Sequence, residues 1–221
     1  MYQVLRRSAG RVALQWRGSL NEKKPARMNS PLLERYKNAL ETYIDAKDNT
    51  RPERIAEVFA PDAVLTFSLA TENIAFPART VGADAIAKTL VTDFGLQYAR
   101  CRTYYLCDAL APQDDRIDSL PWLVLMREPA AGALRVGHGL YRWTFGNDGI
   151  NAGRVTGFHI HIARMDVVPD HGAALLDSLQ EGLSYPWLSP TELREHFGRI
   201  AHGTPALAFI DAFASPPSAQ K

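Results

Sequence analysis

Residues 30–69 read SPLLERYKNALETYIDAKDNTRPERIAEVFAPDAVLTFSL and combine helical spacing with a β-prone run. Ser30 can cap a helix, Pro31 suits the first helical position, and apolar residues then recur every three or four positions. The Ala60-Pro61-Asp62 stretch breaks the helical pattern, and the residues after it are apolar and β-prone. These patterns predict, in order, a helix over 31–47, a short helix over 52–59 and a strand over 63–69.

The rest of the chain continues as a helix, a run of strands and a helical tail. Turn residues separate the predicted strands, and Ser189-Pro190-Thr191-Glu192 is a capping box. We expect helices over 82–94, 171–181 and 190–202, strands over 99–109, 121–128, 133–146 and 153–167, and a short apolar segment over 206–213. Helices followed by a strand meander predict an α+β fold, in which helices cover one face of a curved antiparallel sheet.

Composition places the chain among ordinary globular proteins. Of 221 residues, 46% are hydrophobic and 22% are charged, which fits one domain with appendages. The formal net charge is +1, but residues 1–28 alone carry +6 and the remainder carries −5. This balance excludes a uniformly basic nucleic-acid binder, and no apolar run is long enough for a transmembrane helix. We therefore expect neither a nucleic acid nor a membrane as partner.

The basic leader and the two cysteines bear on location. We expect residues 1–28 to be disordered or to precede the true start at Met28, with an organelle transit peptide as the alternative. Cys101 and Cys107 do not form a disulfide framework, so we expect buried thiols and a cytoplasmic protein. The predicted organisation is the leader 1–28, a main domain over 29–168 and a helical extension over 169–221 packed on the same domain.

The order of elements resembles the SnoaL-like and ketosteroid-isomerase group of the nuclear-transport-factor-2-like (NTF2-like) superfamily, over about residues 31–168. The likeness is carried by Tyr43-Ile44-Asp45 through Phe59-Ala60-Pro61-Asp62-Ala63, by Val81-Gly82-Ala83-Asp84-Ala85-Ile86, and by the closing hairpin with Gly153-Arg154-Val155. The resemblance implies a cone-shaped sheet wrapped on the N-terminal helices, a pocket for a small apolar molecule and no cofactor.

The resemblance also implies site positions. Tyr43 falls where the ketosteroid isomerases carry an oxyanion-hole tyrosine, and Tyr141 falls at the place of their second oxyanion donor. Phe67 stands where those enzymes have their aspartate base, and a phenyl ring cannot abstract a proton. The general base therefore stays unassigned. We expect five side chains to line the pocket as ligand-binding residues: Phe67, Trp122, Trp143, Phe158 and Ile160.

Three histidines form a second candidate constellation: His138, His159 and His161. If Phe145 pairs near Arg154, His138 lies opposite His161, and three imidazoles on one sheet face could bind zinc or act as acid and base. Strand alternation argues against the pocket, because the apolar face of the last two strands is the opposite one. A one-residue bulge would reverse this assignment.

Two different partners could cover the outer face of the predicted sheet, on which the histidines lie. The resemblance implies a homodimer through this face, and the C-terminal helices over 171–213 are another possible cover. Three functions stay open at this point. The chain is a small-molecule pocket protein, in one form a cofactor-independent isomerase, dehydratase or cyclase acting on an apolar cyclic carbonyl compound. Alternatively, it is a non-catalytic binding or dimerisation module whose cone is filled by side chains, or a three-histidine metal enzyme.

Overall fold

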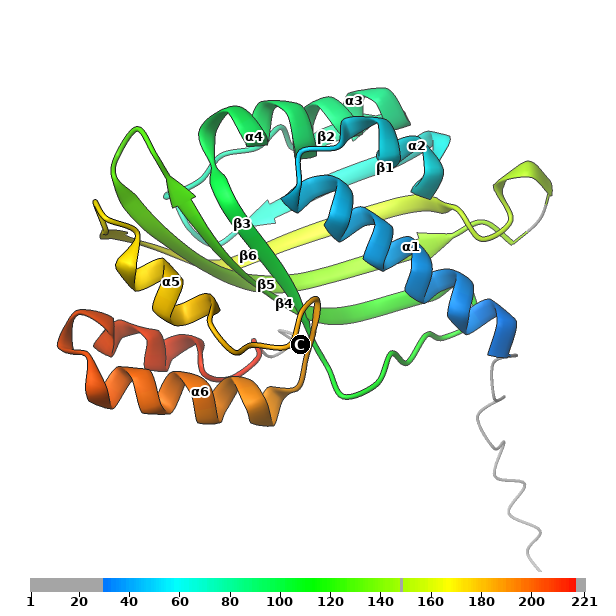
Figure 1. Ribbon diagram of the computed structural model, residues 1–221. Helices are drawn as coiled ribbons and strands as arrows, with labels where there is room; N and C mark the ends of the chain where they lie inside the picture. The colour runs from blue at the N-terminus through cyan, green and yellow to red at the C-terminus, as the bar shows by residue number, and fades with distance from the viewer. Residues whose placement is uncertain (1–29, 148, 218–221) are drawn as a thin grey trace, which may run out of the picture.

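A curved seven-stranded sheet with helices on both faces makes up the molecule (Figure 1). The computed structural model describes residues 30–147 and 149–217. The strand order is β2-β1-β6-β5-β4-β3-β7, and the predicted α+β class is confirmed. The strands are β1 (Phe59–Leu69), β2 (Arg79–Val81), β3 (Ala99–Leu106), β4 (Arg116–Glu128), β5 (Ala133–Phe145), β6 (Val155–Pro169) and β7 (Trp187–Leu188).

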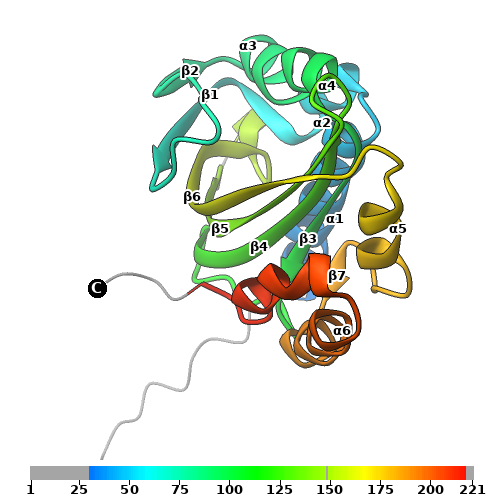
Figure 2. The same cartoon turned by 90° about the vertical axis from the view of Figure 1, so that its left-hand side faces the viewer.

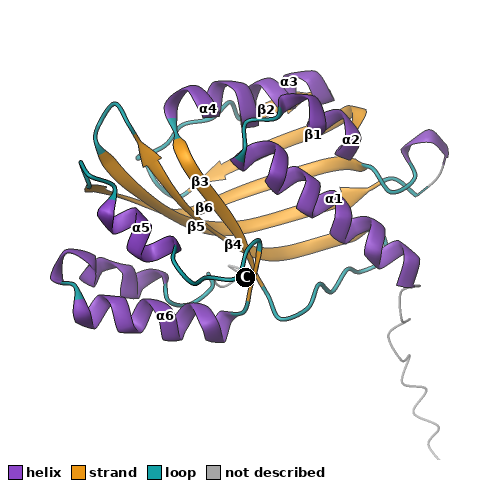
Figure 3. Cartoon of the chain, viewed as in Figure 1, coloured by secondary structure: helices purple, strands orange, loops and turns teal. Residues whose placement is uncertain are grey.

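The helices fall into an N-terminal and a C-terminal group (Figure 3). A π-helical segment over Lys88–Thr92 joins α3 to α4, and a 3-10 segment over Pro205–Phe213, here called the C-terminal 3-10 segment, follows the last helix. The Ser189 hydroxyl accepts a hydrogen bond from the Glu192 backbone N–H, as the capping box predicts. The helices are α1 (Ser30–Asp48), α2 (Ile55–Val58), α3 (Ala83–Ala87), α4 (Asp93–Gln97), α5 (Ala174–Gln180) and α6 (Pro190–Gly203).

Two separate cores form on the two faces of the sheet. The inner core joins Tyr43 and other residues of α1, α2 and the α3–α4 region to the inward residues of the strands, among them Trp143 and Phe158. The outer core joins outward residues of β3, β4 and β5 to α5, α6 and the C-terminal 3-10 segment (Figure 2). Alternate residues of a strand point to opposite faces, so a strand such as β4 serves both cores.

A one-residue irregularity in β6 shifts the pairing of the last two strands. Tyr141 pairs with Ile160 and Leu140 with His161, whereas His138 pairs with Arg164. The expected pairing of His138 with His161 is therefore wrong. Ile162 and Met165, three residues apart, both reach the inner core, because the irregularity reverses the alternation between them. His159 and His161 precede it and keep the predicted outward orientation.

Two short strands and one strand direction differ from the sequence-based expectation. β2 forms within a stretch expected to be irregular, and β7 is a two-residue strand after the turn that follows α5. β1 runs parallel to β6 and β7 runs parallel to β3, while the pairs among β3, β4, β5 and β6 are antiparallel. Such short edge pairings depend on tertiary contacts and leave no periodic signal in the sequence.

The expectations for the two ends of the chain have different outcomes. The leader 1–28 lies outside the described residues. Residues 170–217 pack against the outer face of β3, β4 and β5, where Leu123, Leu134 and Val136 meet Phe197 and Ile210. No helix in the described part of the chain is long and apolar enough to cross a membrane.

Candidate functional site

The interior of the cone holds one small cavity between α1 and the inner face of the sheet. Its volume is about 40 Å³, roughly the space of one or two water molecules. Most of its wall is apolar. Because the cavity is this small, side chains fill most of the cone. The residues with polar side-chain atoms in this wall are Tyr43 and Lys47 from α1, Thr103 from β3, Trp122 from β4 and Tyr141 from β5.

Two hydrogen-bond donors in the cavity wall lack an acceptor. The Tyr43 hydroxyl and the Trp122 Nε1 atom are both fully buried and have no hydrogen-bond partner among the described residues. Leaving a buried donor unpaired costs about 1–3 kcal/mol, so such groups normally find a protein, water or ligand partner. Burial also raises the pKa of Tyr43, which keeps this phenol protonated and able to donate.

The two predicted oxyanion donors come together at this cavity. The rings of Tyr43 and Tyr141 lie edge to face with centroids 6.3 Å apart, and both side chains are buried. Burial, followed by the neighbouring Tyr43 and Tyr105, raises the pKa of Tyr141 well above its ordinary value. Trp122 stacks on Tyr141 at 5.2 Å between ring centroids. The two phenols therefore lie at the same cavity, whereas their role stays a prediction.

The predicted ligand-binding residues divide between the cavity and the core behind it. Phe67, Trp122 and Ile160 line the cavity. Trp143 and Phe158 stack on each other at 3.7 Å, and each lies 5.2 Å from the Tyr43 ring. These two side chains therefore support Tyr43 from the core instead of lining the cavity.

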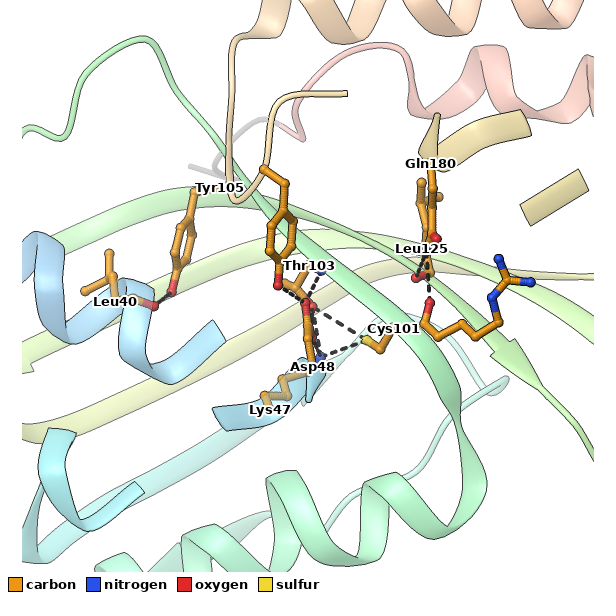
Figure 4. A network of polar contacts seen from close by, with 10 residues as sticks. Leu40, Lys47, Asp48, Cys101, Thr103, Tyr105, Leu125 and Gln180 are labelled. Carbon is orange, nitrogen blue, oxygen red and sulfur yellow. Dashed lines mark hydrogen bonds and ion pairs between the residues drawn. The ribbon is translucent and has the colours of Figure 1, made fainter. Parts of the chain in front are cut away.

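A buried ion pair closes the end of the cavity where α1 meets β3 (Figure 4). Lys47 Nζ donates to Asp48 Oδ1 at 3.0 Å, to Thr103 Oγ1 at 2.8 Å and to Cys101 Sγ at 3.2 Å. Asp48 in turn accepts from the Thr103 backbone N–H at 2.6 Å and from the Tyr185 hydroxyl at 2.9 Å. The Lys47 ammonium therefore has three acceptors, and the Asp48 carboxylate accepts hydrogen bonds from α1, from β3 and from the turn before β7.

Electrostatics fix the charge state of this network. Burial alone disfavours the Lys47 ammonium, but the adjacent Asp48 carboxylate more than offsets this, so the pKa of Lys47 is raised above its ordinary value. Burial and the same carboxylate raise the pKa of the Cys101 thiol to about 12. Lys47 is thus a charged donor and Cys101 a neutral thiol, and neither is a base or a nucleophile at neutral pH.

The cavity wall lacks the side chains that usually accept protons. Within residues 30–147 and 149–217, no carboxylate or imidazole lines it. Asp48 lies next to the cavity but is engaged by Lys47, Thr103 and Tyr185. Phe67 occupies the cavity, as the resemblance implied for the base position. Electrophilic groups are therefore present, and a general base for proton abstraction is not among the described lining residues.

The histidines do not gather at one place. His159 Nδ1 lies 2.8 Å from Thr66 Oγ1, and Ser68 Oγ lies between His159 Nε2 and His161 Nδ1, at 3.0 and 2.8 Å. His138 instead packs against Phe213 of the C-terminal 3-10 segment, with ring centroids 4.8 Å apart and the ring planes tilted by 56°. No group of three potential metal ligands occurs in the part of the chain that the structure describes.

Sequence reasoning missed the Lys47 network. Of the two aspartates near the end of α1, Asp45 pairs with Arg51 and Arg54 at the surface, whereas the Asp48 side chain is buried with Lys47. Lys47 lies one helical turn after Tyr43, which is the one signal that could have indicated a lysine on the buried face.

Helices packed on a curved sheet are the arrangement that the resemblance in the sequence implied. No family model and no curated protein matches the sequence. Several solved structures are similar to this chain in fold. An NTF2-like superfamily protein from Salmonella enterica is 14% identical and has a TM-score of 0.48, with 59% of this chain and 90% of that chain covered.

Two further solved structures carry names that mention an activity. A ketosteroid isomerase-like protein from Erwinia carotovora is 10% identical over 62% of this chain and 99% of its own, with a TM-score of 0.46. A hexachlorocyclohexane dehydrochlorinase, LinA, is 11% identical over 61% of this chain and 87% of its own, also with a TM-score of 0.46. Likenesses this distant carry no information about a reaction.

Proposed function

We propose that this chain is a small-molecule pocket protein that binds a compact apolar compound bearing one hydrogen-bond acceptor. The observation that carries the proposal is the pair of unpartnered buried donors, the Tyr43 hydroxyl and Trp122 Nε1, at one apolar cavity. A carbonyl, nitrile or ether atom of a ligand would accept from them, and apolar walls would bury the remainder. We further propose that the protein acts in the cytoplasm.

Binding fits the lining better than proton-transfer catalysis does. An isomerase, dehydratase or cyclase needs a group that removes a proton, and the described lining supplies only donors and apolar side chains. The largely filled cone is also the arrangement expected of the non-catalytic alternative. Were a reaction to occur, Tyr43 and Tyr141 would stabilise a developing oxyanion, with the base coming from the substrate or from water.

Benzonitrile tests the proposal, because its nitrile stretching band shifts when the nitrogen accepts a hydrogen bond. Its ring is larger than the closed cavity of about 40 Å³, so we expect the apolar wall residues Ile74 and Phe76 to move aside when it binds. We expect saturable binding that quenches tryptophan fluorescence, and a shifted nitrile band in the bound form. Tyr43→Phe should keep the fold and weaken binding about fivefold to tenfold, since one neutral hydrogen bond contributes about 1 kcal/mol.

The matched control is Tyr36→Phe, another buried tyrosine of α1, which stacks on Phe145 and does not line the cavity. It should leave both the affinity and the nitrile band unchanged. Unchanged binding in Tyr43→Phe would remove the assigned donor, and the absence of any saturable binding would overturn the proposed function.

The resemblance also leads us to propose a homodimer, through the part of the outer face that the C-terminal elements leave open. This strip lies on β1 and β6 and presents Thr66, Ser68, His159 and His161. Static light scattering at micromolar concentration measures the mass directly. A monomeric mass at every micromolar concentration measured would overturn the proposed dimer.

A further inference from the structure

A second hollow lies directly outside the cone cavity. Its volume is about 470 Å³, and it opens between the segment 72–77 and α4. Three residues belong to the walls of both spaces: Ile74, Phe76 and Phe94. The partition between the cavity and the surface is therefore one side chain thick at this point.

Two of the three partition residues lie on an irregular segment between β1 and β2. Ile74 is buried and Phe76 is half-buried, while Asn73 and Ala75 beside them are exposed. Phe76 stacks on Phe67 of β1 with ring centroids 4.4 Å apart. Rotation of these two apolar side chains would join the small cavity to the hollow, and the joined space would fall within the 300–1,000 Å³ typical of ligand sites.

The hollow has an acidic balance. Its wall carries three carboxylates, from Glu72, Asp93 and Glu128, and one cation, Arg135. Arg135 is already engaged, because it pairs with Glu128 at 2.8 Å, donates to the Asn73 carbonyl at 2.5 Å and lies over the Tyr98 ring at 5.3 Å. It therefore has little capacity left to bind an anionic ligand.

Two of the carboxylates, in contrast to Arg135, have few or no partners. Glu72 makes no hydrogen bond or ion pair with the described residues, and Asp93 pairs only with Lys88, whose side chain is 69% exposed. The aromatic residues Phe76, Phe94 and Tyr98 line the same wall. Carboxylates next to aromatic faces are the chemistry that recognises an organic ammonium group.

We infer that the hollow is an outer subsite for a protonated amine, so that the ligand is a compact apolar amine whose uncharged end enters the cone. The inference rests on the proposed function, because the inner end of this ligand is the acceptor-bearing group that Tyr43 and Trp122 bind. Glu72 and Asp93 select the charged end, and Ile74 and Phe76 move aside between the two subsites.

Three probes that share one body test the inference. They are para-cyanobenzylamine, para-cyanobenzyl alcohol and para-cyanobenzoate, which are cationic, neutral and anionic at neutral pH. We expect the amine to bind about tenfold more tightly than the benzoate, with the alcohol between them. We also expect the bound amine to show the shifted nitrile band, because the same molecule then occupies both subsites.

Neutralising Glu72 and Asp93, the two carboxylates that Arg135 does not engage, provides the decisive variant. Glu72→Gln with Asp93→Asn should reduce the amine-to-benzoate ratio to about threefold or less. The matched control is Glu181→Gln with Asp211→Asn, the same change of charge at exposed positions of the C-terminal layer, and it should keep the ratio of the wild type.

The outcomes separate the two proposals. If the alcohol binds with a shifted nitrile band but amine and benzoate bind equally, the pocket stands and the outer subsite is overturned. A charge preference that survives in the Glu72→Gln, Asp93→Asn variant also overturns the subsite. If none of the three probes binds saturably, the proposed function fails, and the outer subsite fails with it.

Discussion

Lys47 and Asp48 show how neighbouring residues in a sequence can build a buried ion pair. The side chains are 8% and 2% exposed, so both charges have lost most of their water. The network replaces that water with Thr103, Cys101 and Tyr185 and thereby ties the end of α1 to β3 and to the turn before β7. Such a pair stabilises little by itself, but breaking it leaves an uncompensated charge.

Asp48→Asn should therefore be strongly destabilising. We expect the free energy of unfolding to fall by about 3–5 kcal/mol, because the Lys47 ammonium stays buried without its counter-ion. Chemical denaturation with circular dichroism measures the change. Lys47→Met added to Asp48→Asn should recover most of the loss, because the uncompensated charge is then gone.

Asp45→Asn is the matched control for that prediction. It removes the same charge three residues earlier in α1, where Asp45 pairs with Arg51 and Arg54 at the surface. Surface ion pairs contribute up to about 1 kcal/mol, so the loss should stay within that range. Equal losses in Asp45→Asn and Asp48→Asn would contradict the special role of the buried pair.

Individual residues of the site differ in how well the sequence predicts their positions. Tyr43 and Tyr141 were predicted to meet, and helical spacing together with strand alternation is enough to place both inside the cone. The spacing from Tyr43 indicates on which side of α1 Lys47 lies, but the partners of Lys47 could not be predicted. They depend on which face of β3 carries Cys101 and Thr103 and on how closely β3 approaches α1. Those are tertiary relations with no local signal.

At the scale of elements, small residues in β5 make room for the large side chains of the cone. Gly137 and Gly139 both lie on its inner face. A Cβ atom on Gly139 would lie 1.8 Å from the His161 carbonyl oxygen and 2.8 Å from the Trp122 ring. The glycine is therefore required by the close approach of β6, next to the irregularity that shifts its register.

Gly139→Ala should cost about 3 kcal/mol of stability, because backbone or ring atoms must move to admit the methyl group. Gly198→Ala in α6 adds the same methyl group where no heavy atom lies within 4 Å. It should stabilise the protein by about 0.5–1 kcal/mol, since alanine favours a helix more than glycine does. Thermal unfolding of both variants gives the comparison, and a neutral Gly139→Ala would contradict the packing described.

Periodic elements were predictable and irregular ones were not. The predictions for α1, α6 and the four long strands agree with the structure, apart from a few residues at their ends, because each has a sustained apolar pattern. The irregularity in β6 was foreseen only as a possibility, and it decides that Met165 faces the cone. A single extra residue changes neither composition nor periodicity enough to be located in the sequence.

At the scale of the whole molecule, the sheet is stabilised from both sides, and the two sides differ in chemistry. The inner face holds many aromatic rings and the cavity, whereas the outer face of β3, β4 and β5 is covered by mostly aliphatic residues of the C-terminal elements, together with Phe197 and Phe213. His138 is an exception in this outer layer. It is 9% exposed, and its Nδ1 atom has no partner in the described part of the chain.

Acid should loosen the outer layer through His138. Burial, together with the nearby Arg164, lowers the pKa of His138 from its usual 6.5 to about 4, although Asp166 acts in the opposite direction. Between pH 6.5 and about 4 the unfolded chain therefore binds a proton that the folded chain does not. The stability of the folded state falls as pH is lowered through this window, by up to about 3 kcal/mol for this one group.

The measurement is the difference between two unfolding curves, because carboxylates also lose stabilising interactions in acid. His138→Leu keeps an apolar contact with Phe213 and cannot titrate, so wild type minus variant isolates the histidine. We expect this difference to fall steadily between pH 7 and pH 4, and hydrogen exchange in the C-terminal 3-10 segment to accelerate in the wild type alone. A difference that does not change with pH would mean that His138 is protonated as easily in the folded chain as in the unfolded one. In that case His138 would contribute nothing to the acid sensitivity of the outer layer.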